Sequence, residues 1–237
     1  MKNHEKKMSN VVTKISPLSG DVQGHESFEI EFSDGQKEVI KSWDYTFIYS
    51  VPFLYEKLYC DLLDYKAFEV LGEMLLENVS DKFEELRVLD VACGSGLMGK
   101  YLKQNSPVKI ESLIGSDIIV EATTALQRDY PSIYDKTYTV REKEDFISLH
   151  SYSFNCVSIS GAANHMQLEE FIKYTTFLNK GGYIVFNLLT QNAKGNRRND
   201  ILNWLQKHLI FCDSKLYNHR KLSNGKIIKH EAFLYKK

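Results

Sequence analysis

The stretch that decides the fold is Val88-Leu-Asp-Val-Ala-Cys-Gly-Ser-Gly96, which runs on to Gly99. The apolar run from Arg87 to Cys93 is typical of a buried β-strand, and glycines follow it at once. Residues 94–99 match the spacing G-x-G-x-x-G, which occurs where a strand turns tightly into a helix. We therefore expect a strand, a glycine-rich turn and a helix through Lys103.

The alternation of strand and helix continues toward the C-terminus. Further strands are expected at 112–117, 137–140, 154–160 and 183–189, with helices at about 119–128, 168–178 and 198–210. Gly181-Gly182 is expected to cap the helix before the last of these strands. Two extended segments then flank Asn224-Gly225, a pair typical of tight antiparallel hairpins. This order predicts an α/β fold: a mostly parallel sheet with an antiparallel C-terminal hairpin and helices on both faces.

The first 85 residues do not follow this pattern. Residues 1–42 carry two short apolar–polar alternations separated by Ser33-Asp34-Gly35, and they predict either a hairpin or a loose, partly flexible arm. Residues 43–65 are rich in aromatic side chains, and apolar residues then recur at helical spacing to about residue 83. We expect residues 43–85 to form a helical lid or extension and residues 86–237 to form the main domain.

Composition disfavours several classes of protein. The 237 residues include 30 Lys and Arg against 31 Asp and Glu, a balance that argues against binding of nucleic acid through its phosphates. The four cysteines, at 60, 93, 156 and 212, are too scattered for a zinc site, so no metal is expected and reduced thiols in a cytoplasmic protein are the simplest interpretation. No segment has the roughly 20 apolar residues that span a bilayer, and we expect no membrane association.

The charge beside the glycine turn distinguishes between classes of ligand. A dinucleotide rests its pyrophosphate on such a turn, and Asp90, four positions before Gly94, would repel it. S-adenosylmethionine carries an ammonium and a sulfonium but no phosphate, so a carboxylate there favours it. An NAD-dependent oxidoreductase is accordingly the least favoured enzyme class.

Two further acids follow the next two expected strands. Asp117 closes one strand, where it can accept hydrogen bonds from ribose hydroxyls, and Asp145 follows the other, where it can accept from an adenine amine. Because parallel strands end on one edge of a sheet, these acids and Asp90 are expected to converge on one crevice. Each also has a plainer interpretation, since Asp117 can cap the next helix and Asp145 can be a solvated loop residue.

Over about residues 43–237 the sequence resembles the class I S-adenosylmethionine-dependent methyltransferases. Residues 88–96 are similar to the first motif of that family, Gly115-Ser-Asp117-Ile118 to its second-strand motif, and residues 154–161 and 178–185 to the motifs at its fourth and fifth strands. Ser42-Trp43, and Ser160-Gly-Ala162 with a His after it, resemble the Williams–Beuren-region methyltransferase-like proteins. The resemblance implies a Rossmann-like sheet of seven strands.

The resemblance also implies which residues contact the cofactor. The ribose contact would be Asp117, and the adenine contacts would be Ile118, Asp145 and the Phe146 amide. The methionine end would lie against Asp90, the Gly161 carbonyl and the backbone of Ala92, Gly94 and Gly96.

Two positions depart from the family pattern. Ala92 replaces the usual first glycine, which we expect to be tolerated if the backbone there does not need a positive φ. Asn155 replaces an aspartate at the start of the fourth strand. The Asn-Pro-Pro-aromatic motif that follows this strand in base-amine methyltransferases is absent, which counts against methylation of DNA or RNA amino groups.

Methyl transfer from a sulfonium is an in-line displacement, so the protein mainly aligns the acceptor and excludes water. His165 is the candidate to deprotonate or orient the acceptor, although it can equally be a helix-entry residue bonded to backbone. Asn164, Tyr45 and Tyr49 are candidates to line the acceptor pocket, while most rings in 43–65 are expected to pack the N-terminal helices onto the sheet.

The leading hypothesis is a methyltransferase acting on a small molecule. The alternatives are a protein or RNA acceptor, or a methyltransferase-like binding protein without turnover. The identity of the acceptor and the oligomeric state stay open.

Overall fold

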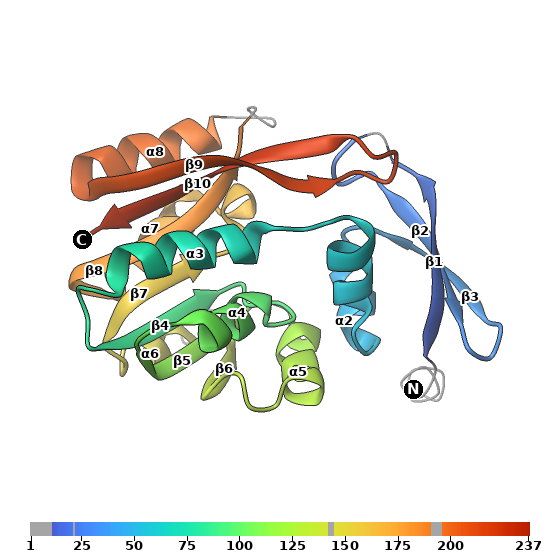
Figure 1. Ribbon diagram of the computed structural model, residues 1–237, viewed down its shortest axis with the longest axis horizontal. Helices are drawn as coiled ribbons and strands as arrows, with labels where there is room; N and C mark the ends of the chain where they lie inside the picture. Colours follow the sequence, from blue (N-terminus) through green and yellow to red (C-terminus); the bar gives the residue numbers. More distant parts are fainter. Residues whose placement is uncertain (1–10, 21, 142–144, 191–195) are drawn as a thin grey trace.

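The computed structural model describes residues 11–20, 22–141, 145–190 and 196–237 of the chain. Its main sheet has seven strands in the order β6-β5-β4-β7-β8-β10-β9. The pairs from β6 to β8 are parallel, and β10 pairs antiparallel with both β8 and β9 (Figure 1). The predicted α/β fold with an antiparallel C-terminal hairpin is therefore confirmed.

The bounds of the main-sheet strands are β4 Glu85–Val91, β5 Lys109–Asp117, β6 Lys136–Thr139, β7 Phe154–Ile159, β8 Leu178–Leu189, β9 Ile210–Lys221 and β10 Ile227–Lys236. The helices of this part of the chain are α3 Ala67–Val79, α4 Leu97–Asn105, α5 Val120–Asp129, α6 Asp145–Leu149, the short 3-10 helix η2 Ala163–His165, α7 Leu168–Thr176 and α8 Arg197–His208.

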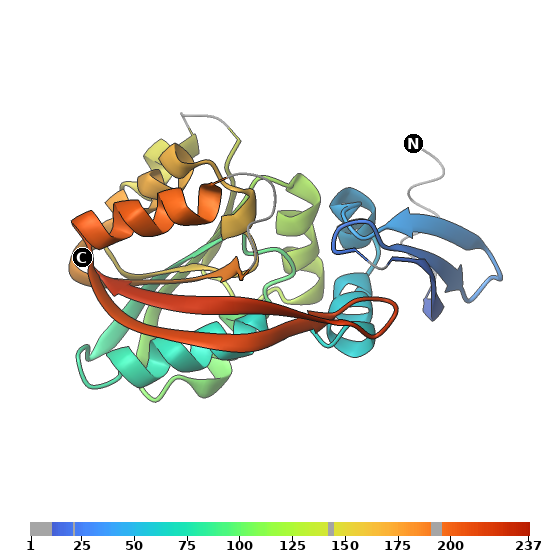
Figure 2. The ribbon, with the colours of Figure 1, turned by 90° about the horizontal axis from the view of Figure 1, so that it is seen from above.

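Helices cover both faces of the sheet, as predicted. One core cluster joins α3 and α4 to the sheet through residues such as Leu75 and Leu102, and a second joins α7 and α8 through Phe171 and Leu205. Figure 2 shows α3 and α8 on opposite sides of the β9–β10 hairpin. Every residue of β7 is buried, which is why this central strand reads as a continuous run without alternation.

Two predicted boundaries are wrong. Gly181 and Gly182 lie inside β8, where they exchange backbone hydrogen bonds with Lys237, and α7 already ends at Thr176. Pairing with neighbouring strands therefore decides the conformation of these glycines, and not the helix before them. The helix α3 ends at Val79 instead of about residue 83, and a turn follows in which the Lys82 amide donates a 3.0 Å hydrogen bond to the Val79 carbonyl.

The N-terminal part forms a second, antiparallel sheet in the order β1-β2-β3, with bounds Val12–Ser19, Ser27–Phe32 and Lys37–Lys41. Of the two alternatives for this part, the structure has the hairpin, which turns at Ser33-Asp34-Gly35 and gains β1 as a third strand. The small sheet lies beside the tip of the β9–β10 hairpin (Figure 1). A buried ion pair between Glu26 and Arg220, 2.5 Å apart, connects the two.

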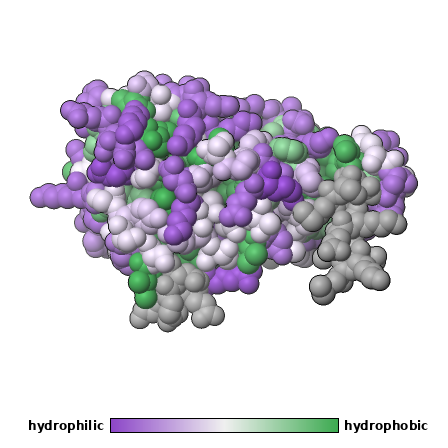
Figure 3. All heavy atoms as spheres, turned by 90° about the horizontal axis from the view of Figure 1, so that it is seen from below, coloured by the Kyte–Doolittle hydropathy of each residue, from purple (hydrophilic) through white to green (hydrophobic). Residues whose placement is uncertain are grey.

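Between the two sheets lie α2 (Tyr45–Ser50) and the π-helix η1 (Glu56–Leu62). Their tyrosines form a continuous stack, in which neighbouring ring centroids lie 4.6–5.9 Å apart from Tyr45 through Tyr49 and Tyr55 to Tyr59. Much of the aromatic stretch thus packs the N-terminal helices against one another, and Tyr59 and Tyr65 also belong to the core cluster that contains Val88 of the main sheet. None of the helices in the described part of the chain is both long and apolar enough to cross a bilayer. The face seen from below is mostly hydrophilic, with hydrophobic atoms in small separate groups (Figure 3).

Candidate functional site

The turn between β4 and α4 has three residues with positive φ: Ala92 at 53°, Gly94 at 54° and Gly96 at 88°. The turn closes through a 2.8 Å hydrogen bond from the Gly96 amide to the Cys93 carbonyl. We expected alanine to be tolerated at position 92 if the backbone there had no positive φ. The backbone does have a positive φ at this position. Ala92 occupies the left-handed region that an L-residue enters only at an energetic cost.

The glycine-rich turn allows two tyrosines to approach its backbone. A Cβ atom at Gly94 would lie 2.7 Å from the Tyr49 hydroxyl, and one at Gly99 would lie 2.5 Å from the hydroxyl of Tyr134. The Gly99 amide donates a 3.2 Å hydrogen bond to that same Tyr134 hydroxyl. Gly99 is therefore needed for the close packing of Tyr134 under the turn.

Asp90 is buried at the carboxyl end of β4. Its Oδ1 accepts a 2.6 Å hydrogen bond from Ser158 on β7, and its Oδ2 accepts one of 2.6 Å from Tyr134. Burial raises the pKa of Asp90 to about 6, the two hydrogen bonds oppose this rise, and the charge of Asp117 adds to it. The carboxyl group is therefore mostly ionised at neutral pH and held in one orientation.

Asp117 ends β5, next to β4 in the sheet, and is also buried. Its carboxylate accepts 2.9 Å hydrogen bonds from the amides of Gly94 and Ile119, and burial raises its pKa against these bonds. The structure thus brings Asp90 and Asp117 together at one edge of the sheet. Ile118 beside them is 57% exposed, so its side chain is available to a ligand.

A cavity of about 40 Å³ lies over this edge of the sheet. Asp90, the turn from Ala92 to Ser95, and Ser160 form its floor, and Tyr49, Tyr55 and Tyr65 are among its other walls. Ligand sites for small molecules and cofactors enclose about 300–1,000 Å³. The tyrosine-bearing segment 45–65 must therefore move before a nucleoside-sized ligand can occupy this site.

Gly161 follows β7 at the other end of the cavity. Its amide donates a 2.8 Å hydrogen bond to Asn187 Oδ1 on β8. A Cβ atom at Gly161 would lie 2.6 Å from the Tyr65 hydroxyl, which is also 3.4 Å from Ser160 Oγ. Gly161, Ser160 and Tyr65 thus meet at the side of the cavity away from Asp117.

Among the described residues, Asn164, His165, Phe146 and Tyr45 do not line the cavity. The Asn164 side chain accepts a hydrogen bond from the Leu189 amide, which ties η2 to the end of β8. The His165 side chain is exposed in part, and the part that is shielded from solvent lowers its pKa, with the charge of Arg197 as a second cause. Phe146 stacks on Phe177, and Tyr45 packs in the tyrosine stack. Asp145 begins α6, but its side chain lies outside what the structure describes.

Asn155 has a structural role that explains the missing aspartate. Its side chain accepts a 2.7 Å hydrogen bond from the Arg87 amide and donates one of 2.8 Å to the Glu85 carbonyl. These bonds join the starts of β7 and β4, at the opposite end of the strands from the cavity.

Sequence reasoning missed Tyr134 and Ser158, which hold Asp90, and Tyr55 and Tyr65, which line the cavity. Tyr134 lies in the segment between α5 and β6 and matches no local motif. Gly99 and Gly115 are the sequence features that point to a bulky neighbour, because a Cβ atom at either position would crowd the Tyr134 ring.

No protein-family model and no curated protein matches this sequence. Solved structures do match it at low identity. An S-adenosylmethionine-dependent methyltransferase from Clostridium acetobutylicum has a TM-score of 0.52 and 13% identity, covering 77% of this chain and 96% of its own. An O-methyltransferase from Bacillus cereus has a TM-score of 0.51 and 9% identity, covering 71% and 81%.

A Pyrococcus horikoshii protein assigned as an RNA methyltransferase also has a TM-score of 0.51, with 10% identity over 70% of this chain and 82% of its own. Proteins described with different acceptors therefore match equally well, and the likeness bears on the backbone arrangement alone. The chain has the Rossmann-like fold of the S-adenosylmethionine-dependent methyltransferases.

Proposed function

We propose that this protein is an S-adenosylmethionine-dependent methyltransferase that acts on a small molecule. The observation that carries the proposal is the charge of the cavity: Asp90 lines it, Asp117 lies beside it, and no Lys, Arg or His is among its described lining residues. Such a site favours a ligand with cationic groups and no phosphate, which supports S-adenosylmethionine over a dinucleotide.

The residues present fit this cofactor. In the proposed arrangement Asp117 holds the ribose, the exposed Ile118 lies against the adenine, and Asp145 with the Phe146 amide meets the adenine edge. The methionine end lies over Asp90, the backbone of 92–96 and the Gly161 carbonyl. When bound, the cofactor supplies a methyl group activated on a sulfonium, and the chain aligns the acceptor with it and excludes water.

Two features support a small-molecule acceptor. Tyr49, Tyr55 and Tyr65 of the segment 45–65 line the cavity, and aromatic walls with a few polar groups are typical of small-molecule sites. The formal charge of −1 provides no general attraction to a nucleic acid backbone. We place Tyr49 in the wall shared by the cofactor and acceptor sites. That Tyr45 and Asn164 line the acceptor pocket, and that His165 deprotonates or orients the acceptor, stay predictions.

Calorimetry with S-adenosylhomocysteine and NAD tests the cofactor assignment. We expect S-adenosylhomocysteine to bind and Asp117→Asn to weaken it about tenfold to a hundredfold, because hydrogen bonds to a charged group contribute about 1.5–3 kcal/mol. Asp81→Asn, at an exposed position far along the chain, is the matched control. Tighter binding of NAD, or unchanged affinity in Asp117→Asn, would contradict the assignment. Binding of S-adenosylmethionine without turnover on any acceptor would favour the silent binding protein.

A further inference from the structure

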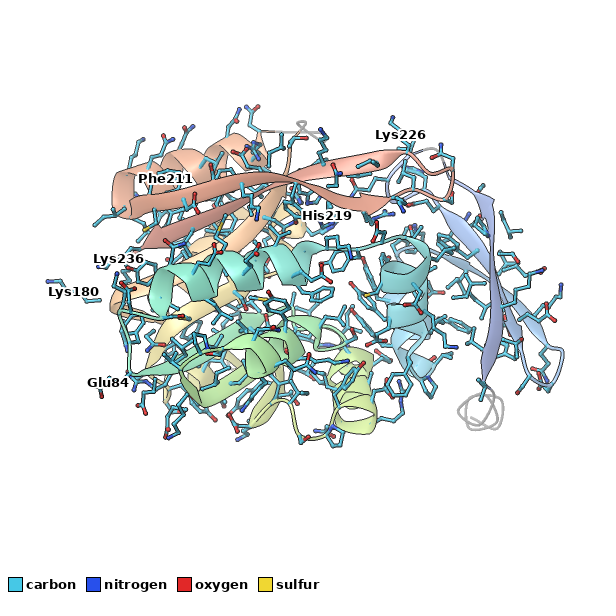
Figure 4. All side chains as sticks on the ribbon, viewed as in Figure 1. Glu84, Lys180, Phe211, His219, Lys226 and Lys236 are labelled. Atoms are coloured by element: carbon cyan, nitrogen blue, oxygen red, sulfur yellow. The ribbon has the colours of Figure 1, made fainter. Side chains whose placement is uncertain are left out.

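A row of buried polar side chains leads from Gly161 to the edge of the sheet. Asn187 on β8 accepts from the Gly161 amide at 2.8 Å and lies 2.7 Å from Nδ1 of His230 on β10. His230 stacks on His219 of β9, with ring centroids 3.5 Å apart and planes within 4°. All three side chains are at most 4% exposed. Figure 4 shows His219 close to the segment that leads into α3.

The hydrogen bonds of Asn187 determine the tautomer of His230. The Gly161 amide can only donate, so the Asn187 atom that faces it is the carbonyl oxygen Oδ1. The amide nitrogen Nδ2 then donates to Nδ1 of His230, and the proton of the neutral imidazole is on Nε2. This Nε2–H is buried and has no hydrogen-bond partner among the described residues. Such an orphaned donor is rare in folded proteins and calls for an acceptor beyond those that the described residues supply.

The charges around His230 restrict what that acceptor can be. Burial, then Arg220, His165 and Arg198, lower the pKa of His230 to about 3, so the ring stays neutral. The described carboxylates nearby are engaged, because Glu26 pairs with Arg220 and Glu231 pairs with Arg198. An ammonium group would meet cations and a hydrogen-bond donor here, whereas an oxygen atom would receive the donated hydrogen bond.

Tyr65 forms the wall between the cavity and the histidine pair. Its ring lines the cavity beside Asp90 and Ser160, and its edge packs on His219 with centroids 5.0 Å apart. Asp64, just before it, has a φ of 56°, a conformation that an L-residue adopts at a cost. A movement of the Tyr65 ring would therefore open the cavity toward His219, on which His230 stacks.

We propose that the Nε2–H of His230 binds an oxygen atom of the methyl acceptor, which is a neutral or anionic oxygen-bearing small molecule and not an amine. This inference rests on the methyltransferase function proposed above. It makes His230 an acceptor-binding residue, separate from the carboxylates that hold the cofactor.

The test uses full-length protein with ¹⁵N-labelled histidine, saturated with S-adenosylhomocysteine. A matched series of benzoates, benzyl alcohols and benzylamines is added, and the Nε2–H resonance of His230 is followed by NMR. We expect benzoates and benzyl alcohols to shift this resonance and benzylamines to leave it unchanged. Shifts caused equally by benzylamines, or no shift with any member of the series, would overturn the proposal.

Variants provide a second measurement. His230→Phe keeps an aromatic ring in the stack but removes the Nε2–H donor together with the Nδ1 acceptor of Asn187. It should weaken the bound benzoate about tenfold or more while S-adenosylhomocysteine affinity changes less than about twofold. His208→Phe, on the exposed face of α8, is the control and should change neither. Equal benzoate affinity in His230→Phe and wild type would also refute the proposal. A wild-type protein that does not bind S-adenosylhomocysteine would instead remove the proposed function itself, so the two failures are distinguishable.

Discussion

Replacing Ala92 by glycine is expected to stabilise the protein, although glycine substitutions usually destabilise. Ala92 has a φ of 53° in the turn that follows β4. The left-handed conformation costs an L-residue about 1–2 kcal/mol, and glycine adopts it freely but loses about 0.5–1 kcal/mol more backbone entropy on folding. The methyl group is only partly buried, so little packing is lost. The difference predicts a net gain of about 0.5–1 kcal/mol in the free energy of unfolding.

Urea denaturation at equilibrium measures this gain as a higher midpoint with an unchanged slope. For a chain of this length the melting temperature should rise by about 1–4 °C. Ala162→Gly is the matched control, because Ala162 is also partly buried beside the site but has a φ of −105°. That variant should lose about 0.5–1 kcal/mol. If Ala92→Gly is destabilised as much as Ala162→Gly, the backbone at 92 is not under the strain inferred here.

Two further predictions concern the carboxyl group of Asp90. Tyr134→Phe should lower the free energy of unfolding by about 1–3 kcal/mol and raise the pKa of Asp90, because the carboxylate loses a buried hydrogen-bond donor. NMR titration measures this pKa, and the control variant Tyr152→Phe should leave it unchanged. The folded pKa of about 6 exceeds the usual 3.8, so the folded state binds more protons between these values. The contribution of Asp90 to stability is therefore fully present below about pH 4 and is lost as the pH rises through 6, by up to about 3 kcal/mol. Asp90→Asn should remove this pH dependence from urea midpoints, and an identical profile in the variant would contradict the raised pKa.

The sequence predicted the main sheet well because its strands are identified by local patterns. The continuous apolar runs of β4 and β8 and the Asn224-Gly225 hairpin need no knowledge of distant residues. The errors arose where tertiary pairing decides. The strand β1 contains Pro17 and is mostly exposed, so it has no clear alternation, and it forms because β2 offers a partner. Gly181-Gly182 has the composition of a helix cap but is used within β8.

The candidate site was predictable as far as its motif residues and no further. Asp90 and Asp117 meet as their positions at the ends of adjacent strands require. The hydroxyl groups that hold Asp90 belong to Tyr134, 44 residues away in the sequence, and Ser158, 68 residues away. No local sequence pattern predicts contacts between residues so far apart. Alanine at position 92 resembles an ordinary strand residue, and the signal for its positive φ was the glycine usual at this position in the methyltransferase family that the sequence resembles.

The two carboxylates serve the fold as well as the proposed ligand. Asp117 accepts from the Gly94 amide and so helps to hold the glycine turn against the end of β5, while Asp90 joins β4 to β7 through Ser158. Burial alone would disfavour both charges, and the hydrogen-bond donors around them oppose this effect by stabilising the charged forms. A cationic ligand would therefore find the negative charge already oriented, and little of its binding energy would be spent on arranging the site. This double role is also the reason that each carboxylate variant must be compared for stability before a change in its ligand affinity is interpreted.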